Sequence, residues 1–367
     1  MPNKSSKIVR NRERGASILE VVVAVVIGLL VLAGVYKIFQ SNSQSYRTQE
    51  AAARIQENGR LAVELLSRDI RMTGYKGCTL FGDTDNVLNN ATRIEFDFDR
   101  AIEGYDNIDS SNLPVRVSDA LDPNDIDFVN STDIVVVRVT RSEAVPIVED
   151  NTSTQLFAYV SGNQANGCPD GSTRVSGLCS GDLLMVSDCT KSRVFQTGVI
   201  QNVSGILEVD HPASGDPGND SSLWGGTNST AREQFGEDSE IMKVSTLIYF
   251  VAENDRGVPT LYLKESNLEP VELVEGVENM QVLYGVDTGG SPEVDAYVPA
   301  YGTHDNTNWT NVRSVRLALL LRSSDEIGGG DVDTNTYDLL GTSVGPMNDR
   351  HIRRVVNTTI AIRNRLQ

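Results

Sequence analysis

The chain has few of the residues that enzymes use for catalysis. It contains three histidines in 367 residues, His211, His304 and His351, and each lies in a turn-like or polar stretch. The sequence has no Gly-x-Ser-x-Gly nucleophile elbow, no phosphate-binding P-loop and no zinc-protease motif. These absences argue against the common hydrolase and nucleotide-binding classes. We therefore expect neither an enzyme nor a bound cofactor.

Positive charge is also scarce. Lys and Arg number 32 against 50 Asp and Glu, which gives a formal net charge of −18. Phosphate binding requires a clustered positive field, so this composition excludes nucleic-acid binding by a general electrostatic mechanism. The acids crowd stretches rich in Asp and Asn, such as Asp83 to Asn90 and Asp331 to Asp338, which we expect to be loops between strands.

Cysteine is limited to four residues, Cys78, Cys168, Cys179 and Cys189. No Cys-x-x-Cys or Cys/His pair has the spacing of zinc ligands, so disulfides in an exported domain are the better interpretation. Cys168 and Cys179 flank the turn sequence Pro169-Asp170-Gly171 and predict a local bridge. Cys78 and Cys189 are then left to each other, and that bond would close a long loop of the unfolded chain and so stabilise the fold.

One acidic loop resembles the first half of a calcium-binding loop. Asp331, Asp333 and Asn335 alternate as calcium ligands do. The sixth position is Thr336, where Gly is needed, and the twelfth is Thr342, where Glu is needed. A solvated turn is the better interpretation, and we expect no metal site.

The longest apolar run is at the N-terminus. Ala16 to Tyr36 covers 21 residues, or about 31 Å as an α-helix, which is enough to cross a bilayer core. The preceding leader, Met1 to Gly15, has a net charge of +4 and should stay cytoplasmic. A secretory signal would place a small-residue cleavage site after the apolar core, whereas Lys37 to Gln40 offers none. We therefore expect a single-pass anchor that stays on the mature protein. Loss of the leader would leave the mature chain with a net charge near −22.

Glu20 is an unusual residue for such an anchor, because an unpaired carboxylate in lipid costs several kcal/mol. Cleavage after Gly15 would make Ala16 the first residue and Glu20 the fifth. The new α-amino cation of a neighbouring subunit could then pair with Glu20, which would favour assembly over a lone helix. The alternative is that Glu20 reaches the lipid headgroups by itself.

The helical pattern continues from Lys37 to about Thr73, with no proline between Ala16 and Leu113. Ile55, Ala62, Leu66 and Ile70 recur at helical spacing, and this apolar face should lie against a sheet. Gly59 falls on the same face, where it either allows a strand to approach or is a tolerated flaw that costs about 1 kcal/mol relative to Ala. Acid-first pairs on other faces, Glu50 with Arg54 and Glu64 with Arg68, should support the helix.

After Cys78 the pattern changes to short runs rich in β-branched residues, and no second long helix is evident. The predicted strands are Asp133 to Val139, Leu183 to Val186, Val194 to Ile200, Val244 to Val251, Thr260 to Lys264, Asn279 to Val286, Val312 to Leu321 and Val355 to Ile362. In the last two strands, residues that would face the core alternate with residues that would face outward. These two strands are therefore candidates for the sheet that covers the helix. We expect a leader at 1–15, an anchor at 16–36, an amphipathic helix at 37–77 and a β-rich head at 78–367, with a second lobe between about Asn107 and Glu240.

The N-terminal segment Arg14-Gly15-Ala16-Ser17 with Glu20 resembles the class III leader of type IV pilins. More narrowly, the chain resembles the minor pilin PilW family. The blocks that carry this resemblance are Gln56 to Arg60, Arg68 to Cys78, Gly181 to Leu183 with Ser187 to Cys189, Gly276 to Glu278 with Tyr284 to Asp287, and Arg353-Arg354 with Thr358 to Leu366. They are spread from end to end of the chain. One departure is Ala16, because pilins more often begin their mature chain with Phe or Met.

The resemblance implies an α+β pilin-like fold, in which the long N-terminal helix packs on an antiparallel sheet of an enlarged head. It implies processing by a prepilin peptidase between Gly15 and Ala16, and assembly through Ala16 and Glu20. The implied role is that of a minor pilin in a priming or tip complex of a type IV pilus, with other minor and major pilins and a tip adhesin as partners. Such a protein would sit in the inner membrane with a periplasmic head before it joins the pilus and supports adhesion, twitching motility or DNA uptake.

Two alternatives share parts of this pattern. A minor pseudopilin of a type II secretion system has the same leader, anchor and Glu20, but the head motifs favour the pilus. A membrane-tethered periplasmic binding module belongs to another class of protein. It would keep its leader, so the mass of the mature N-terminus distinguishes it.

Overall fold

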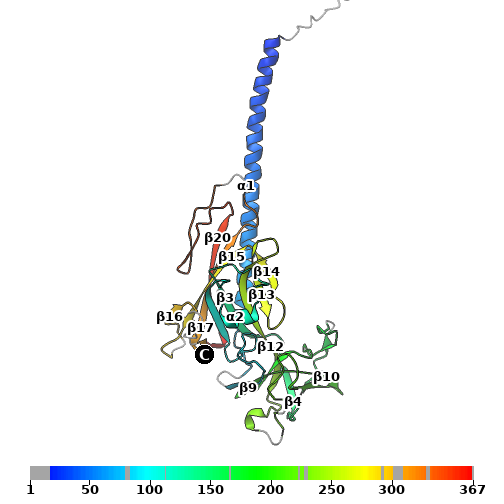
Figure 1. Cartoon of the computed structure of the whole chain (residues 1–367). Coiled ribbons are helices and arrows are strands. Elements are labelled where there is room, and N and C mark those ends of the chain that lie inside the picture. The colour runs from blue at the N-terminus through cyan, green and yellow to red at the C-terminus, as the bar shows by residue number, and fades with distance from the viewer. Residues whose placement is uncertain are drawn as a thin grey trace, which may run out of the picture.

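The long helix dominates the shape of the molecule. The computed structural model describes residues 17–78, 83–111, 113–164, 167–221, 224–226, 230–290, 293–300, 309–327 and 331–365. Helix α1 runs without interruption over the 55 residues Ile18–Met72, a length of about 82 Å. Its first half projects from the head, and its second half lies along the head (Figure 1).

A four-stranded antiparallel sheet supports the second half of α1. Its order is β16 (Ala296–Val298), β15 (Val277–Val286), β17 (Val312–Arg322) and β20 (Arg353–Ala361). The hairpin of β18 (Tyr337–Leu339) and β19 (Thr342–Val344) forms a small core with the even-numbered residues of β17, where Leu339 clusters with Ala318 and Leu320. The odd-numbered residues Val315, Leu317, Leu319 and Leu321 belong to the core that contains α1.

The second sheet has 12 strands and is mixed. Its central strand β12 (Glu240–Glu253) is 14 residues long, and it pairs with one set of strands through its first residues and with another through its last. The other strands are β1 (Asp83–Asn86), β2 (Ile102–Ile108), β3 (Thr132–Thr140), β4 (Val145–Glu149), β5 (Gln155–Tyr159), β8 (Leu183–Ser187), β9 (Lys191–Gln196), β10 (Ile200–Val203), β11 (Ile206–Asp210), β13 (Pro259–Glu265) and β14 (Val271–Glu275). All of its pairs are antiparallel except β1 with β9, which is parallel.

Short elements complete the described part of the chain. They are α2 (Val115–Ala120), the hairpin β6 (Asn163–Gln164) with β7 (Arg174–Val175), and the 3-10 turns η1 (Ala231–Glu233), η2 (Trp309–Asn311) and η3 (Arg363–Arg365). The architecture is α+β and pilin-like, as the resemblance implied, with a β-rich head behind one long helix.

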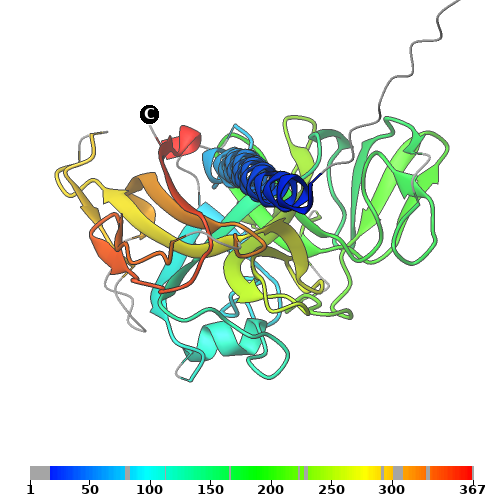
Figure 2. The ribbon, with the colours of Figure 1, turned by 90° about the horizontal axis from the view of Figure 1, so that it is seen from above.

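The largest hydrophobic core joins α1 to both sheets. It includes Ile55 and Leu66 of the helix, Leu247 of β12 and Leu317 of β17. Viewed from above (Figure 2), α1 lies near the edge of the head, with the four-stranded sheet on one side and strands of the large sheet on the other. A second core around Phe195, Trp224 and Phe235 lies among β4, β5, β8, β9 and β11, in the region where we expected a second lobe. Because β12 contributes to both cores, this region is joined to the rest by a continuous strand.

One predicted strand was wrong. Val194 to Ile200 was expected as a single strand, but β9 ends at Gln196 and β10 begins at Ile200. The break lies at Gly198, whose backbone is so close to Pro212 and Asp210 that an added Cβ would lie 2.7 and 2.6 Å from their side chains. The other seven predicted strands overlap strands of the structure, with ends that differ by up to four residues.

Candidate functional site: the apolar helix and its attachment to the head

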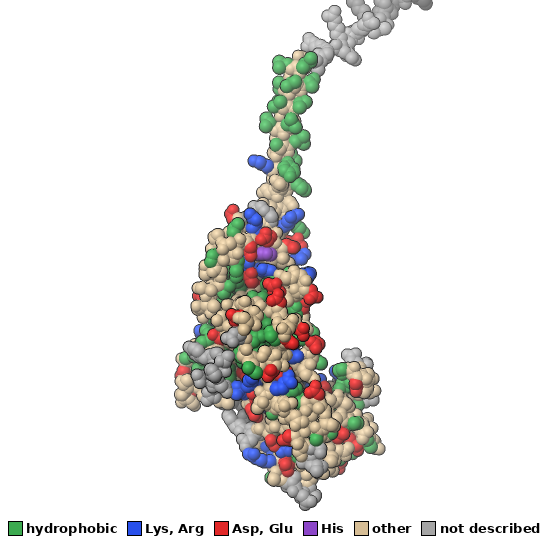
Figure 3. Space-filling model, in the orientation of Figure 1, with side chains coloured by type: hydrophobic (Ala, Val, Ile, Leu, Met, Phe, Trp, Pro, Cys, Tyr) green, Lys and Arg blue, Asp and Glu red, His purple; other side chains and the backbone are tan. Residues whose placement is uncertain are grey.

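The first half of α1 exposes its apolar side chains on every side. Ile18, Leu30 and Phe39 are 84%, 69% and 70% exposed. Figure 3 shows these side chains along the projecting helix, whereas the head carries mixed charges. A helix that is apolar all round must be covered by lipid or by other helices. Among the described residues, α1 is the one helix long and apolar enough to cross a membrane.

Glu20 lies in the first turn of this helix and is exposed. It is the only charged residue from Ser17 to Tyr36. Gly15 and Ala16 lie outside the described residues, so the predicted processing site and the predicted pairing of the Ala16 amine with Glu20 remain predictions.

The second half of α1 is attached through the predicted apolar face. Ile55, Ala62, Leu66 and Ile70 are all buried. Gly59 lies among them, and an added Cβ would be 3.2 Å from Cδ1 of Leu321 and 3.2 Å from Cγ2 of Val356. Gly59 therefore allows a close approach, although the atoms that approach are side chains and not a strand backbone.

Asp69 is a buried acid on the same face of α1. Its carboxylate accepts a hydrogen bond from the Tyr249 hydroxyl on β12 and another from Arg68 Nε at 2.9 Å, and Arg141 Nη1 lies 3.8 Å away. Burial and the nearby Asp69 charge raise the pKa of Tyr249, so the phenol stays a hydrogen-bond donor. Arg68 thus pairs with Asp69 at this point rather than with Glu64 as the sequence suggested, while the expected Glu50 to Arg54 ion pair is present at 2.7 Å.

Two asparagines attach the ends of the docked segment. Asn58 Nδ2 donates to the Glu275 carbonyl at 2.9 Å. Asn364 Nδ2 donates to the Thr73 carbonyl at 3.2 Å, where the helix has just ended. Such bonds satisfy backbone carbonyls that a helix end or a strand edge leaves without partners. Together with Asp69 they fix α1 against the head along most of its docked length.

The last strand is held to the rest of the sheet by Arg353. Its guanidinium is buried and donates to both oxygens of Glu278, at 2.6 and 2.8 Å, and to both oxygens of Asp349. These hydrogen bonds from Arg353 lower the pKa of Asp349 to about 2. Asp333 joins the same group, since Arg353 Nη1 lies 3.1 Å from it. The acidic loop that resembled a calcium site is thus a turn tied to Arg353.

Two disulfides are present. Cys78 pairs with Cys189 at a Cα separation of 4.7 Å, and Cys168 pairs with Cys179 at 5.7 Å. The first joins the chain just beyond α1 to the turn between β8 and β9. The structure therefore joins the pairs that the spacing predicted. Among the described residues, no group of three or more His, Cys, Asp or Glu is placed to hold a metal ion.

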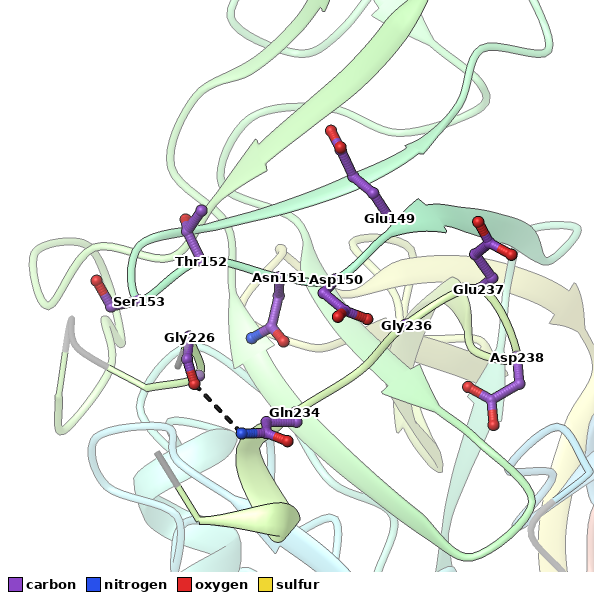
Figure 4. A pocket seen from close by; sticks show the side chains of 11 residues that line it. Glu149, Asp150, Asn151, Thr152, Ser153, Gly226, Gln234, Gly236, Glu237 and Asp238 are labelled. Carbon is purple, nitrogen blue, oxygen red and sulfur yellow. Dashed lines mark hydrogen bonds between the residues drawn. The ribbon is translucent and has the colours of Figure 1, made fainter. Parts of the chain in front are cut away.

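One cavity of the head is lined by described residues outside α1. Its volume is about 1090 Å³. Figure 4 shows the side chains that line it, which come from the segment 149–153 and from the segment that ends at Asp238. Its described lining includes the acids Glu149, Asp150, Glu237 and Asp238, but no histidine, lysine or arginine. His211, expected in a polar turn, is instead buried and stacked on Trp224 with ring centroids 4.0 Å apart. His304 lies outside the described residues.

Two family models match the chain. Residues 10–36 match the prokaryotic N-terminal methylation motif, and residues 248–364 match type IV pilus-assembly protein W. These two segments of the chain are similar to a PilW-family pilin. No curated protein and no solved structure matches the chain. Pilin and pilus-assembly families are generally structural.

The segment that matches the PilW family supplies most of the partners that hold α1. It contains Tyr249, Leu321, Val356 and Asn364. The sequence had indicated several of these positions through their motifs, but it did not identify Tyr249 or Arg141 as partners of Asp69. The available signal was Asp69 itself, because an acid at helical spacing on an apolar face requires a buried partner.

Proposed function

We propose that this type IV pilus minor pilin acts in the priming or tip complex of the pilus. It is anchored in the inner membrane as a single-pass protein with a periplasmic head, is processed between Gly15 and Ala16 by a prepilin peptidase, and then joins other minor and major pilins. A tip adhesin is the further partner expected for such a complex. Adhesion, twitching motility and DNA uptake are the processes that it would serve.

The observation that supports this proposal most strongly is the contrast between the two halves of α1. The second half is fixed to the head by Asp69, Asn58 and Asn364, whereas the first half exposes apolar side chains all round and a single acid. A lipid bilayer can cover the apolar surface, but it leaves Glu20 without a counter-charge. A bundle of pilin helices covers the same surface and supplies an α-amino group to pair with Glu20. The helix therefore suits transfer from the membrane into a filament.

Replacement of Glu20 by Ala tests the proposal. The variant should be processed and should remain in the membrane. Its head should fold unchanged, because the head is attached to α1 independently of Glu20. We expect it to lose crosslinks to other pilins and to reduce the number of pili. The matched control is Glu57→Ala, an exposed acid on the docked half of α1, which should assemble normally. Undiminished crosslinking and normal piliation with Glu20→Ala would contradict the proposal and favour a headgroup contact.

A further inference from the structure

β20 is an edge strand of the four-stranded sheet. In the described part of the chain it pairs only with β17. The N–H of Ile362 donates to the Arg313 carbonyl at 2.9 Å, and the N–H of Ser323 donates to the Ile352 carbonyl at 2.9 Å. Alternate residues of an antiparallel strand point their N–H and C=O groups to the same side. The even-numbered residues of β20 therefore bond to β17, and Arg353, Val355, Asn357, Thr359 and Ala361 point these groups away from the sheet.

Among the described residues, neither a bulge nor a proline of β20 blocks the addition of another strand. The pairing with β17 runs through nine consecutive residues without a bulge, and the strand has no proline. Asn357, Thr359 and Ala361 are exposed. Natural sheets usually protect an edge with a bulge, a proline, a covering loop or a very short strand. The edge strands β16, β10 and β1 have only three or four residues, and β14 is irregular where it pairs with β13.

The charge of this segment is opposite in sign to the net charge of the whole chain. Residues 350–365 contain five arginines and no acid, in a protein with a net charge of −18. Arg353 is committed to Glu278 and Asp349, and Arg365 donates to the Trp309 carbonyl. Arg354 and Arg363 are exposed, and they lie at the two ends of the free edge. An incoming strand would thus meet a positive group at each end of a neutral stretch.

We propose that the free edge of β20 binds an extended acidic segment of a neighbouring pilin subunit as an additional β-strand. Main-chain hydrogen bonds to Asn357, Thr359 and Ala361 would supply affinity, and Arg354 and Arg363 would select acidic residues that flank the added strand. The inference rests on the proposed function, because α1 brings subunits together and lies beside β20 in the head (Figure 2). A strand added here would therefore continue the contact that the helices begin.

Asn357→Pro is the direct test of the shared strand. Proline removes the outward N–H and places its ring at the edge, but it leaves the bonds to β17 intact, which is why edge strands tolerate it. Asn357→Ala is the matched control, because it removes the same side chain and keeps the N–H. Both full-length variants should keep both disulfides and similar melting temperatures in detergent. A photo-crosslinking residue at Thr359 then reports the partner in living cells, with the same residue at the exposed Gln201 of β10 as the control position.

We expect Thr359 to crosslink to an acidic segment of another subunit that carries its own methylation motif. The crosslink should fall about tenfold or more with Asn357→Pro, since several interchain hydrogen bonds are lost together, and should be unchanged with Asn357→Ala. Arg354→Glu combined with Arg363→Glu should reduce it as well. An unchanged crosslink in the proline variant, a crosslink to a second copy of this chain, or none at Thr359 would overturn the inference. If Glu20→Ala blocks assembly while Asn357→Pro has no effect, the strand inference fails and the proposed function stands.

Discussion

Asp69 of α1 accepts a hydrogen bond from Tyr249 of β12, a residue 180 positions later in the chain. Both residues are buried, and the contact joins the end of the docked helix to the central strand of the large sheet. A buried acid is stable only when donors surround it. The contact therefore makes the orientation of α1 relative to the head specific, beyond what apolar packing alone provides.

Removal of this acid should weaken the attachment of the helix. Asp69→Ala leaves the Tyr249 hydroxyl without its acceptor, and we expect a loss of about 1 to 3 kcal/mol in the free energy of unfolding. Tyr249→Phe should cost less, because Arg68 still pairs with Asp69. Chemical denaturation of the full-length chain in detergent measures the loss of stability in Asp69→Ala and in Tyr249→Phe. Glu57→Ala, at an exposed position, is the control. Equal stability of Asp69→Ala and Glu57→Ala would show that the contact contributes nothing.

Gly59 should tolerate only small changes. A leucine at this position would meet Leu321 and Val356 at distances too short for a larger side chain, and overpacking of this kind typically costs about 1 to 3 kcal/mol. Gly34→Leu is the matched control, since nothing lies within 4 Å of a Cβ added there. We expect a lower melting temperature for Gly59→Leu alone. The same melting temperature for both variants would mean that the helix does not lie closely on β17 and β20.

Stability should fall as the pH rises from about 4 to about 8, because of Asp133. Burial raises the pKa of Asp133 to about 8, and the same group ionises near 3.9 in an unfolded chain. Between these values the folded protein binds a proton that the unfolded chain has released, so its stability decreases with pH and levels off above about 8. Asp349 has the opposite effect, because its pKa in the folded protein is lowered to about 2. Its contribution to the free energy of unfolding is therefore lost only as the pH falls below about 4.

A series of denaturation curves between pH 4 and pH 8 measures this dependence. Asp106→Asn provides the comparison, because the charge of Asp106 is one of the causes that raise the pKa of Asp133. We expect the slope of stability against pH to be smaller in this variant than in the wild type. Replacement of the exposed Asp125 by Asn should leave the slope unchanged. A wild-type stability that rises steadily through this range would contradict the assignment.

The two disulfides should contribute unequally. Cys78 and Cys189 are separated by 111 residues and Cys168 and Cys179 by 11, so loss of the first should cost about 5 kcal/mol and loss of the second about 3 kcal/mol on the chain-entropy model. Unfolding of the two double serine variants compares them, and non-reducing peptide mapping of the wild type tests the pairing itself. Free thiols at all four positions, or a peptide that links Cys78 to Cys168, would contradict it.

Much of the helix could be predicted from the sequence, because its signals are local. The apolar run, the missing prolines and the spacing of Ile55, Ala62, Leu66 and Ile70 depend on nearest neighbours along one helix. The partner of Asp69 could not be predicted in this way, because Tyr249 is brought to it by the register of β12 with β3 and by the packing of two sheets. The break at Gly198 has the same origin, since the obstacle is Pro212 on a later segment. The acidic hollow near Asp150 is likewise formed by segments about 80 residues apart.

The mass of the mature N-terminus in sheared pili tests the central claim most directly. If the chain is a processed pilin, protein recovered from sheared and washed pili should begin at Ala16, and a Gly15→Glu chain should keep its leader and be absent from that fraction. Recovery of the chain only from inner membranes with the leader still attached, or an Ala16 terminus in the Gly15→Glu chain, would contradict the account.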